Sequence, residues 1–129
     1  MPEPTDDQWA YALDAVRAFL VTAARTGTTV TYGEVATVPG TDLEPSGPRS
    51  LAAILRAIST SEDEAGRGLL TVVVVRRRTG LPGEGFFRLA AERGRDISDP
   101  TRLFELERQR VRRARAPRSP QDQNSSNAG

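Results

Sequence analysis

Two short helical patterns joined by a polar loop, in the segment 30–59, constrain the fold of this chain more than any other feature. The first pattern begins after Thr31, because Thr31 and Glu34 have the spacing with which two side chains cap each other's free backbone amides. It must end by Pro39-Gly40, since proline disfavours helical geometry in the residue before it and glycine accepts the turn that follows. The segment therefore predicts two separate helices.

The second helix of this pair is predicted over residues 48–59, because Pro48 suits a first helical position. Its apolar residues recur at the spacing of a face that packs on a core, namely Leu51, Ile54, Leu55 and Ile58. The opposite face carries Arg49, Ala52, Ala53 and Arg56. Small residues between two arginines let a helix approach a DNA groove closely, and the alternative is a plain solvated face. Arg49, Ser50 and Arg56 are the predicted groove contacts.

Further cap signals predict helices at both ends of the domain. Thr5 with Gln8 repeats the capping arrangement and starts a helix that stops near Gly27. Asp99-Pro100 supplies a cap and a first-turn proline for a last helix. The first helix is expected to pack against the back of the helix pair, and the last to cover the open side of the core.

Residues 69–75 and 86–90 are predicted as two strands joined by a glycine-rich loop. The glycine spacing over 80–85 is compatible with a phosphate-binding loop, but such a loop opens a helix, and residues 86–90 do not resemble a helix start. The predicted fold is therefore α+β, a winged helix-turn-helix with three helices, a β-hairpin wing and a C-terminal helix.

The 129 residues are enough for one domain, predicted over 5–115. Residues 1–4 are expected to be disordered, as are residues 116–129, whose composition is mainly Pro, Ser, Gln and Asn. The sequence has no apolar run of membrane-spanning length and no signal peptide. We expect a cytoplasmic protein without a membrane partner, nucleoid-associated if it binds DNA.

The chain has neither cysteine nor histidine, and all 18 basic residues are arginine. This composition excludes disulfides, thiolate nucleophiles, imidazole bases and Schiff-base lysines, and the usual zinc sites with them. The adjacent carboxylates Glu62, Asp63 and Glu64 lack the alternating spacing of metal ligands and are expected to be a solvated run. We therefore expect no enzyme activity, catalytic residue, metal or cofactor.

The net charge is only +1, so the distribution of charge has to indicate the partner. Arginines gather at 76–78 and from 108 to 118, where the stretch leading into the tail can add phosphate affinity or only solubility. The predicted phosphate contacts are Thr31, Tyr32, Arg76, Arg77 and Arg78. An alternative for Tyr32 is a half-buried aromatic residue at a helix start.

The segments 31–36 and 47–55 resemble the DNA-binding half of the O6-alkylguanine DNA alkyltransferases and alkyltransferase-like proteins. The resemblance extends loosely to 69–75, 80–85 and 103–106, and only 31–36 matches closely. It implies a winged-helix domain that enters the minor groove, a tyrosine at Tyr32 that presses on a phosphate, and an arginine of the recognition helix that replaces a flipped nucleotide.

Two departures limit what the resemblance implies. Ala52 stands where the family has the intercalating arginine, with Arg49 one turn earlier, so nucleotide extrusion is not implied. The segment 72–76, where the family has its Pro-Cys-His-Arg motif, holds neither cysteine nor histidine, which makes alkyl transfer to cysteine impossible.

The sequence predicts a non-enzymatic protein that binds double-stranded DNA through the recognition helix 48–59 and a basic wing, 76–88. The alternative is a protein-interaction or dimerisation module on the same scaffold, with a homodimer or another protein as its partner through the first or last helix.

Overall fold

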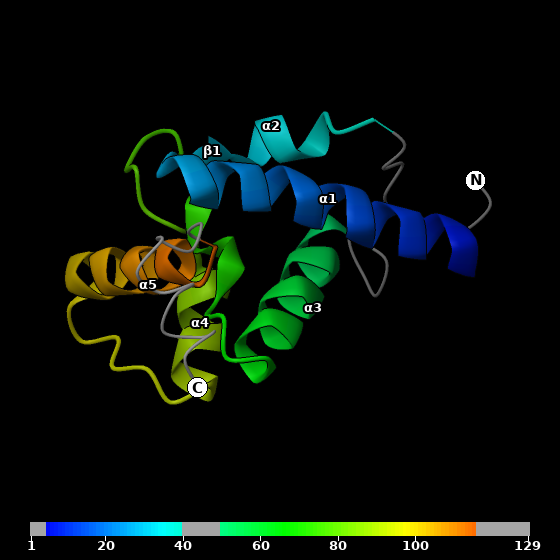
Figure 1. The fold of residues 1–129 in the computed structure, drawn as a ribbon. Coiled ribbons are helices and arrows are strands. Elements are labelled where there is room, and N and C mark those ends of the chain that lie inside the picture. The colour runs from blue at the N-terminus through cyan, green and yellow to red at the C-terminus, as the bar shows by residue number, and fades with distance from the viewer. Residues whose placement is uncertain (1–4, 40–49, 116–129) are drawn as a thin grey trace, which may run out of the picture.

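The structure is a computed structural model that describes residues 5–39 and 50–115, and it belongs to the α+β class (Figure 1). Its elements are α1 (Asp6–Thr26), β1 (Val30–Thr31), α2 (Tyr32–Ala36), α3 (Leu51–Glu64), the 3-10 helix η1 (Leu70–Val73), β2 (Val74–Val75), α4 (Glu84–Glu92) and α5 (Pro100–Arg115). None of the helices in these two ranges is long and apolar enough to cross a membrane.

The local capping signals act as predicted. Thr5 and Gln8 form a capping box at the start of α1, which ends at Gly27 with a φ of 71° that favours glycine. Thr31 and Glu34 form the same box at the start of α2. The last helix begins at Pro100, as predicted.

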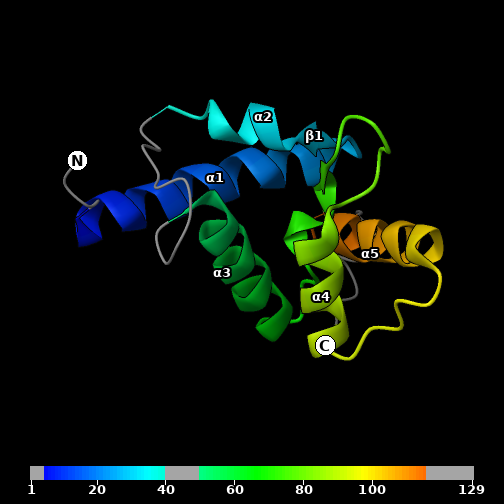
Figure 2. The ribbon, with the colours of Figure 1, turned by 180° about the vertical axis from the view of Figure 1, so that it is seen from behind.

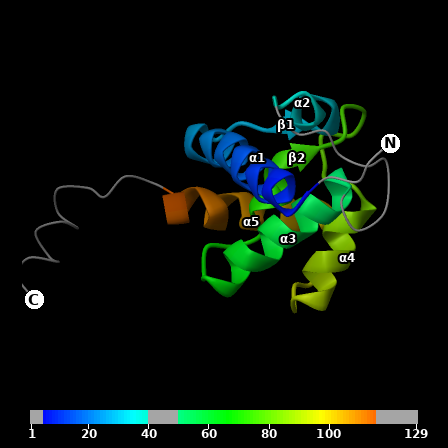
Figure 3. The ribbon, with the colours of Figure 1, turned by 90° about the vertical axis from the view of Figure 1, so that its right-hand side faces the viewer.

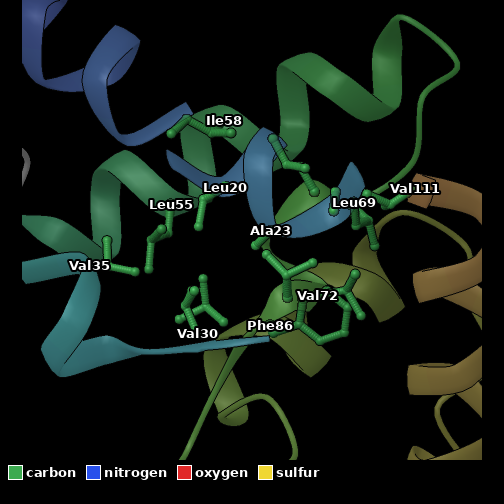
Figure 4. Close-up of a cluster of buried hydrophobic side chains, with 14 of the residues drawn as sticks. Leu20, Ala23, Val30, Val35, Leu55, Ile58, Leu69, Val72, Phe86 and Val111 are labelled. Carbon is green, nitrogen blue, oxygen red and sulfur yellow. The ribbon is translucent and has the colours of Figure 1, made fainter. Parts of the chain in front are cut away.

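The core surrounds η1, which is fully buried and contacts α1, α3 and α5. Figure 3 shows α1, α3 and α5 around this central segment, and Figure 4 shows side chains from all of them meeting there. The predicted core stripe of α3 is confirmed, since Ile54, Leu55 and Ile58 are buried and Leu51 packs against the core. The helix itself begins later than predicted, with Ser50 as its N-cap, and continues to Glu64.

The predicted hairpin is wrong. Residues 86–90 belong to the helix α4, in which Phe86, Leu89 and Ala90 are buried at helical spacing. The chain passes from β2 through a loop into α4 (Figure 2), and β2 pairs in parallel with the distant β1 instead. The branched-aliphatic run is buried as predicted, but most of it forms η1, because it fills the centre of a helical core rather than one face of a sheet.

Candidate nucleic-acid interface

The parallel strand pair brings two of the predicted phosphate-contact segments together. Val30 pairs with Val74 and Thr31 with Val75, so both strands end at the same edge of the sheet. Tyr32 follows one strand and Arg76 follows the other, although they are far apart in sequence. An open hollow of about 560 Å³ lies at this edge. It is lined by Thr31, Tyr32, Gly33, Glu34, Thr37, Val75, Arg76, Arg77 and Arg78.

Tyr32 and Arg76 share the space beside Gly83. A Cβ atom added at Gly83 would lie 3.2 Å from the Tyr32 hydroxyl and 3.1 Å from Arg76 Nε. The φ of Gly83 is −81°, which any residue adopts, so only close approach bears on this position, where a larger residue would shift the two side-chain ends by a few tenths of an ångström. The Tyr32 ring packs against the core, and the residue is half-buried. Tyr32 is therefore both a half-buried aromatic at a helix start and a hydroxyl placed next to a guanidinium group.

Arg76, Arg77 and Arg78 are exposed. Over 5–39 and 50–115, no carboxylate lies within 4.0 Å of their guanidinium groups. Their loop is closed by two backbone bonds, from Arg76 N–H to the Leu81 carbonyl at 2.9 Å and from Gly80 N–H to the Arg76 carbonyl at 2.8 Å. Gly80 has a φ of 68°, which favours glycine at this turn. The loop thus presents three adjacent cations, with which no carboxylate of the described ranges forms an ion pair.

A second hollow, of about 240 Å³, lies between α3 and α4. It is lined by Tyr32, Ala52, Leu55, Arg56, Thr71, Gly85, Phe86, Arg88 and Leu89. Tyr32 borders both hollows, so they adjoin at this residue, with Arg76 lining the first and Arg56 the second. Thr71 lines the second hollow, and its buried hydroxyl lies 2.5 Å from that of Ser59.

Arg56 is exposed, as the predicted recognition face requires, but its guanidinium forms an ion pair with Glu92 of α4. The two side chains are 52% and 46% exposed, so a phosphate can compete for the arginine in solvent. Arg56 therefore joins the candidate interface with a competing carboxylate beside it.

Arg88 is a further exposed cation at the second hollow. Among the described residues, no carboxylate pairs with it. The prediction missed it because residues 86–90 were assigned to a strand. The helical spacing of Phe86, Leu89 and Ala90 is the signal that could have placed Arg88 on the solvent side of α4.

The structure does not place the other three predicted contact residues, Arg49, Ser50 and Thr31, as exposed groups at the interface. Arg49 lies outside the described residues. The Ser50 side chain is buried, and its hydroxyl accepts a hydrogen bond from Ala53 N–H at 3.2 Å. The hydroxyl is thus occupied in capping α3, and the burial of its side chain disfavours the predicted groove contact. The Thr31 hydroxyl is used within its capping box, accepting from Glu34 N–H and donating to the Glu34 carboxylate.

Many of the remaining arginines pair with carboxylates inside the fold. Glu62, only 1% exposed, pairs with Arg17, Arg67 and Arg115. Asp63 and Glu107 share Arg95 between them, with Nη2 to Asp63 Oδ1 at 2.6 Å and Nε to Glu107 Oε1 at 3.0 Å. The predicted solvated run over 62–64 is therefore wrong for Glu62 and Asp63, which join α3 to α5 and to the segment after α4.

These contacts shift the pKa values of the carboxyl groups. Burial acts to raise the pKa of Glu62, but hydrogen bonds from Arg67 and Arg115, and their charges, outweigh it and lower the pKa below its ordinary value. For Asp63, burial likewise acts upward, and Arg95 and Arg93 bring the pKa below its ordinary value. Both side chains are held as carboxylates, so the arginines that pair with them stabilise the fold and are not available to bind a partner.

Comparison with protein-family models, curated proteins and solved structures found no match to this chain.

Proposed function

We propose that this protein is a non-enzymatic double-stranded DNA-binding protein. The observation that carries the proposal is that Tyr32 borders two hollows, one lined by the exposed arginines 76–78 and the other by Arg56. The three loop arginines have no internal carboxylate partner among the described residues, so phosphate can bind them without breaking an ion pair.

In this proposal, the first hollow holds the phosphate backbone. Arg76 and the Tyr32 hydroxyl, which lie side by side at Gly83, contact one phosphate, and Arg77 and Arg78 contact its neighbours. The exposed Ala52 and Arg56 of α3, together with Arg88 of α4, face the groove. We further propose that α2 and α3 act as a helix-turn-helix on an alkyltransferase-like scaffold, with the loop after β2 in place of a hairpin wing.

We assign the hollows no catalytic role. Glu34 borders the first hollow, but its carboxylate accepts from the Thr31 backbone amide at 3.0 Å and from the Thr31 hydroxyl at 3.1 Å. A carboxylate held in a capping box serves the start of α2 rather than proton transfer. The proposed activity is therefore binding alone.

The test is a fluorescence-anisotropy titration of the full chain against a short duplex at low salt. We expect affinity, and we expect the triple variant Arg76→Ala, Arg77→Ala, Arg78→Ala to lose most of it. A matched control replaces Arg25, Arg102 and Arg113, which are exposed and unpaired within the described residues. This control has the same net charge as the variant of Arg76, Arg77 and Arg78, and it should bind DNA like the unmodified protein.

Two outcomes would contradict the proposal. Absence of affinity at low salt would remove DNA as the partner, since phosphate contacts are strongest under that condition. Equal losses in the two triple variants would show that total charge, and not this surface, is responsible. A chain that lacks affinity and runs as a dimer in sedimentation would support the interaction-module alternative.

A further inference from the structure

Thr79 directly follows the three loop arginines. In the whole sequence it is the only serine or threonine with arginines at both the second and the third positions before it, here Arg77 and Arg76. The residue is exposed, in the loop between β2 and α4. Its hydroxyl accepts a hydrogen bond from Leu81 N–H at 3.2 Å and lies 3.4 Å from the Leu81 carbonyl, which are long contacts that are easily given up.

We propose that Thr79 is a phosphorylation site for an arginine-directed serine/threonine protein kinase, and that phosphate at this position weakens DNA binding. Thr79 Oγ1 attacks the γ-phosphorus of a nucleoside triphosphate, and the bond from that phosphorus to the bridging oxygen breaks. The nucleoside diphosphate leaves, and the hydroxyl proton passes to the kinase's base. The effect on DNA rests on the proposed function, whereas the modification itself does not.

The free guanidinium groups before Thr79 are what a kinase of this class would recognise. Carboxylates in a substrate groove bind arginines by charge-assisted hydrogen bonds, which requires arginines without internal partners. Ser98 shows the contrast, since the arginine at its third preceding position is Arg95, which Asp63 and Glu107 hold. Ser59 follows Arg56 at the same distance but is fully buried.

The consequence for DNA follows from charge. A phosphothreonine carries about −1.5 to −2 charges at pH 7, which offsets about half to two thirds of the +3 contributed by Arg76, Arg77 and Arg78. Its oxygens also compete with DNA phosphates for the same donors. If two phosphate contacts are lost, at about 0.9 per contact, the slope of log K against log salt becomes smaller by about 1.8. Since this contribution grows as salt falls below about 1 M, the loss of affinity at about 0.1 M salt is more than roughly tenfold.

The test incubates the full chain with a purified arginine-directed kinase and MgATP, followed by mass spectrometry of the peptides. We expect phosphate on Thr79 and almost none on the Thr79→Ala variant. Thr79→Ala alone should leave DNA affinity unchanged, because the hydroxyl contributes no charge. Phosphate placed elsewhere, or equal labelling of Thr79→Ala, would overturn the site.

The regulatory step is tested separately, by titrating the phosphorylated protein against the same duplex. At about 0.1 M salt we expect at least a tenfold weaker affinity than for the unmodified chain, and a slope of log K against log salt that is smaller by about 1.8. Unchanged affinity of the phosphorylated protein would overturn this step. If the unmodified chain lacks affinity, the proposed function and the regulatory step fail together, while the labelling result still decides the site.

Discussion

The carboxylate of Glu62 connects three helices and a loop, so its removal should strongly destabilise the fold. It lies on α3, is 1% exposed, and pairs with Arg115 of α5, Arg67 of the following loop and, at 3.5 Å, Arg17 of α1. The substitution Glu62→Gln keeps the shape of the side chain and removes the charge. Three guanidinium groups then lose their shared counter-ion.

The magnitude follows from burial. The Arg115 side chain is only 16% exposed and its Nε atom is already buried without a hydrogen bond, so most of its guanidinium is shielded from solvent. Removing one partner of a buried pair costs about 3–5 kcal/mol. Against a typical total stability of about 5–15 kcal/mol, this should lower Tm by on the order of 10 °C or more.

The assay is thermal and urea unfolding followed by circular dichroism, with Glu64→Gln as control. Glu64 is the next carboxylate but one on the same helix, is 64% exposed, and lies 3.9 Å from Arg93. A surface pair of this kind contributes about 0–1 kcal/mol, so the control should unfold near the unmodified protein. Equal stability of the two variants would refute the reasoning.

The stability difference between Glu62→Gln and the unmodified protein should depend on pH. Because the folded-state pKa of Glu62 lies below its ordinary value of 4.5, the pair stabilises the protein above that pH. This stabilisation disappears as the pH falls through the lower folded-state pKa. The gap in stability between Glu62→Gln and the unmodified protein should therefore close in acid, and a gap that widens would contradict the assignment.

Three further predictions concern the interface. Glu92→Gln frees Arg56 and should tighten DNA binding several-fold in an anisotropy titration; weaker binding would show that the pair helps to position the arginine. Tyr32→Phe removes the hydroxyl beside Gly83, and the loss of one hydrogen bond worth about 0.5–1.5 kcal/mol should raise Kd about two- to tenfold with little change in Tm. Gly83→Ala should weaken binding by shifting the ends of the Tyr32 and Arg76 side chains; unchanged affinity would contradict the role of close approach.

Local capping chemistry made much of the fold predictable. Thr5, Thr31 and Pro100 each act within a few residues, so the starts of α1, α2 and α5 could be placed from the sequence. The core face of α3 was predictable for the same reason, because its apolar period is local.

Non-local packing accounts for the errors. The pairing of β1 with β2 joins residues more than forty positions apart, and no local signal specifies it. The N-cap of the helix α4 is Gly83, which has no side chain to cap it, and the Phe86-Phe87 pair is typical of a strand. Glu62 was expected to be solvated, although it lies at helical spacing from Leu55 and Ile58 on the core side of α3. Only the structure reveals the arginines that make its burial possible.

The candidate interface was predicted in part. Tyr32 and Arg76 were both named from the sequence, yet the hairpin expected to present the arginine does not form. Parallel pairing of the two strands brings the residues together instead. Arg88 became visible as a surface cation only once α4 was known, and Ser50 proved to be a buried cap.

The salt dependence of DNA affinity tests the central claim most directly. If Arg76, Arg77 and Arg78 each bind a phosphate, the slope of log K against log salt should be smaller by about 2.7 in their triple alanine variant than in the unmodified chain. The matched variant at Arg25, Arg102 and Arg113 should keep the original slope. Identical slopes in all three proteins would contradict the assignment of this surface to DNA.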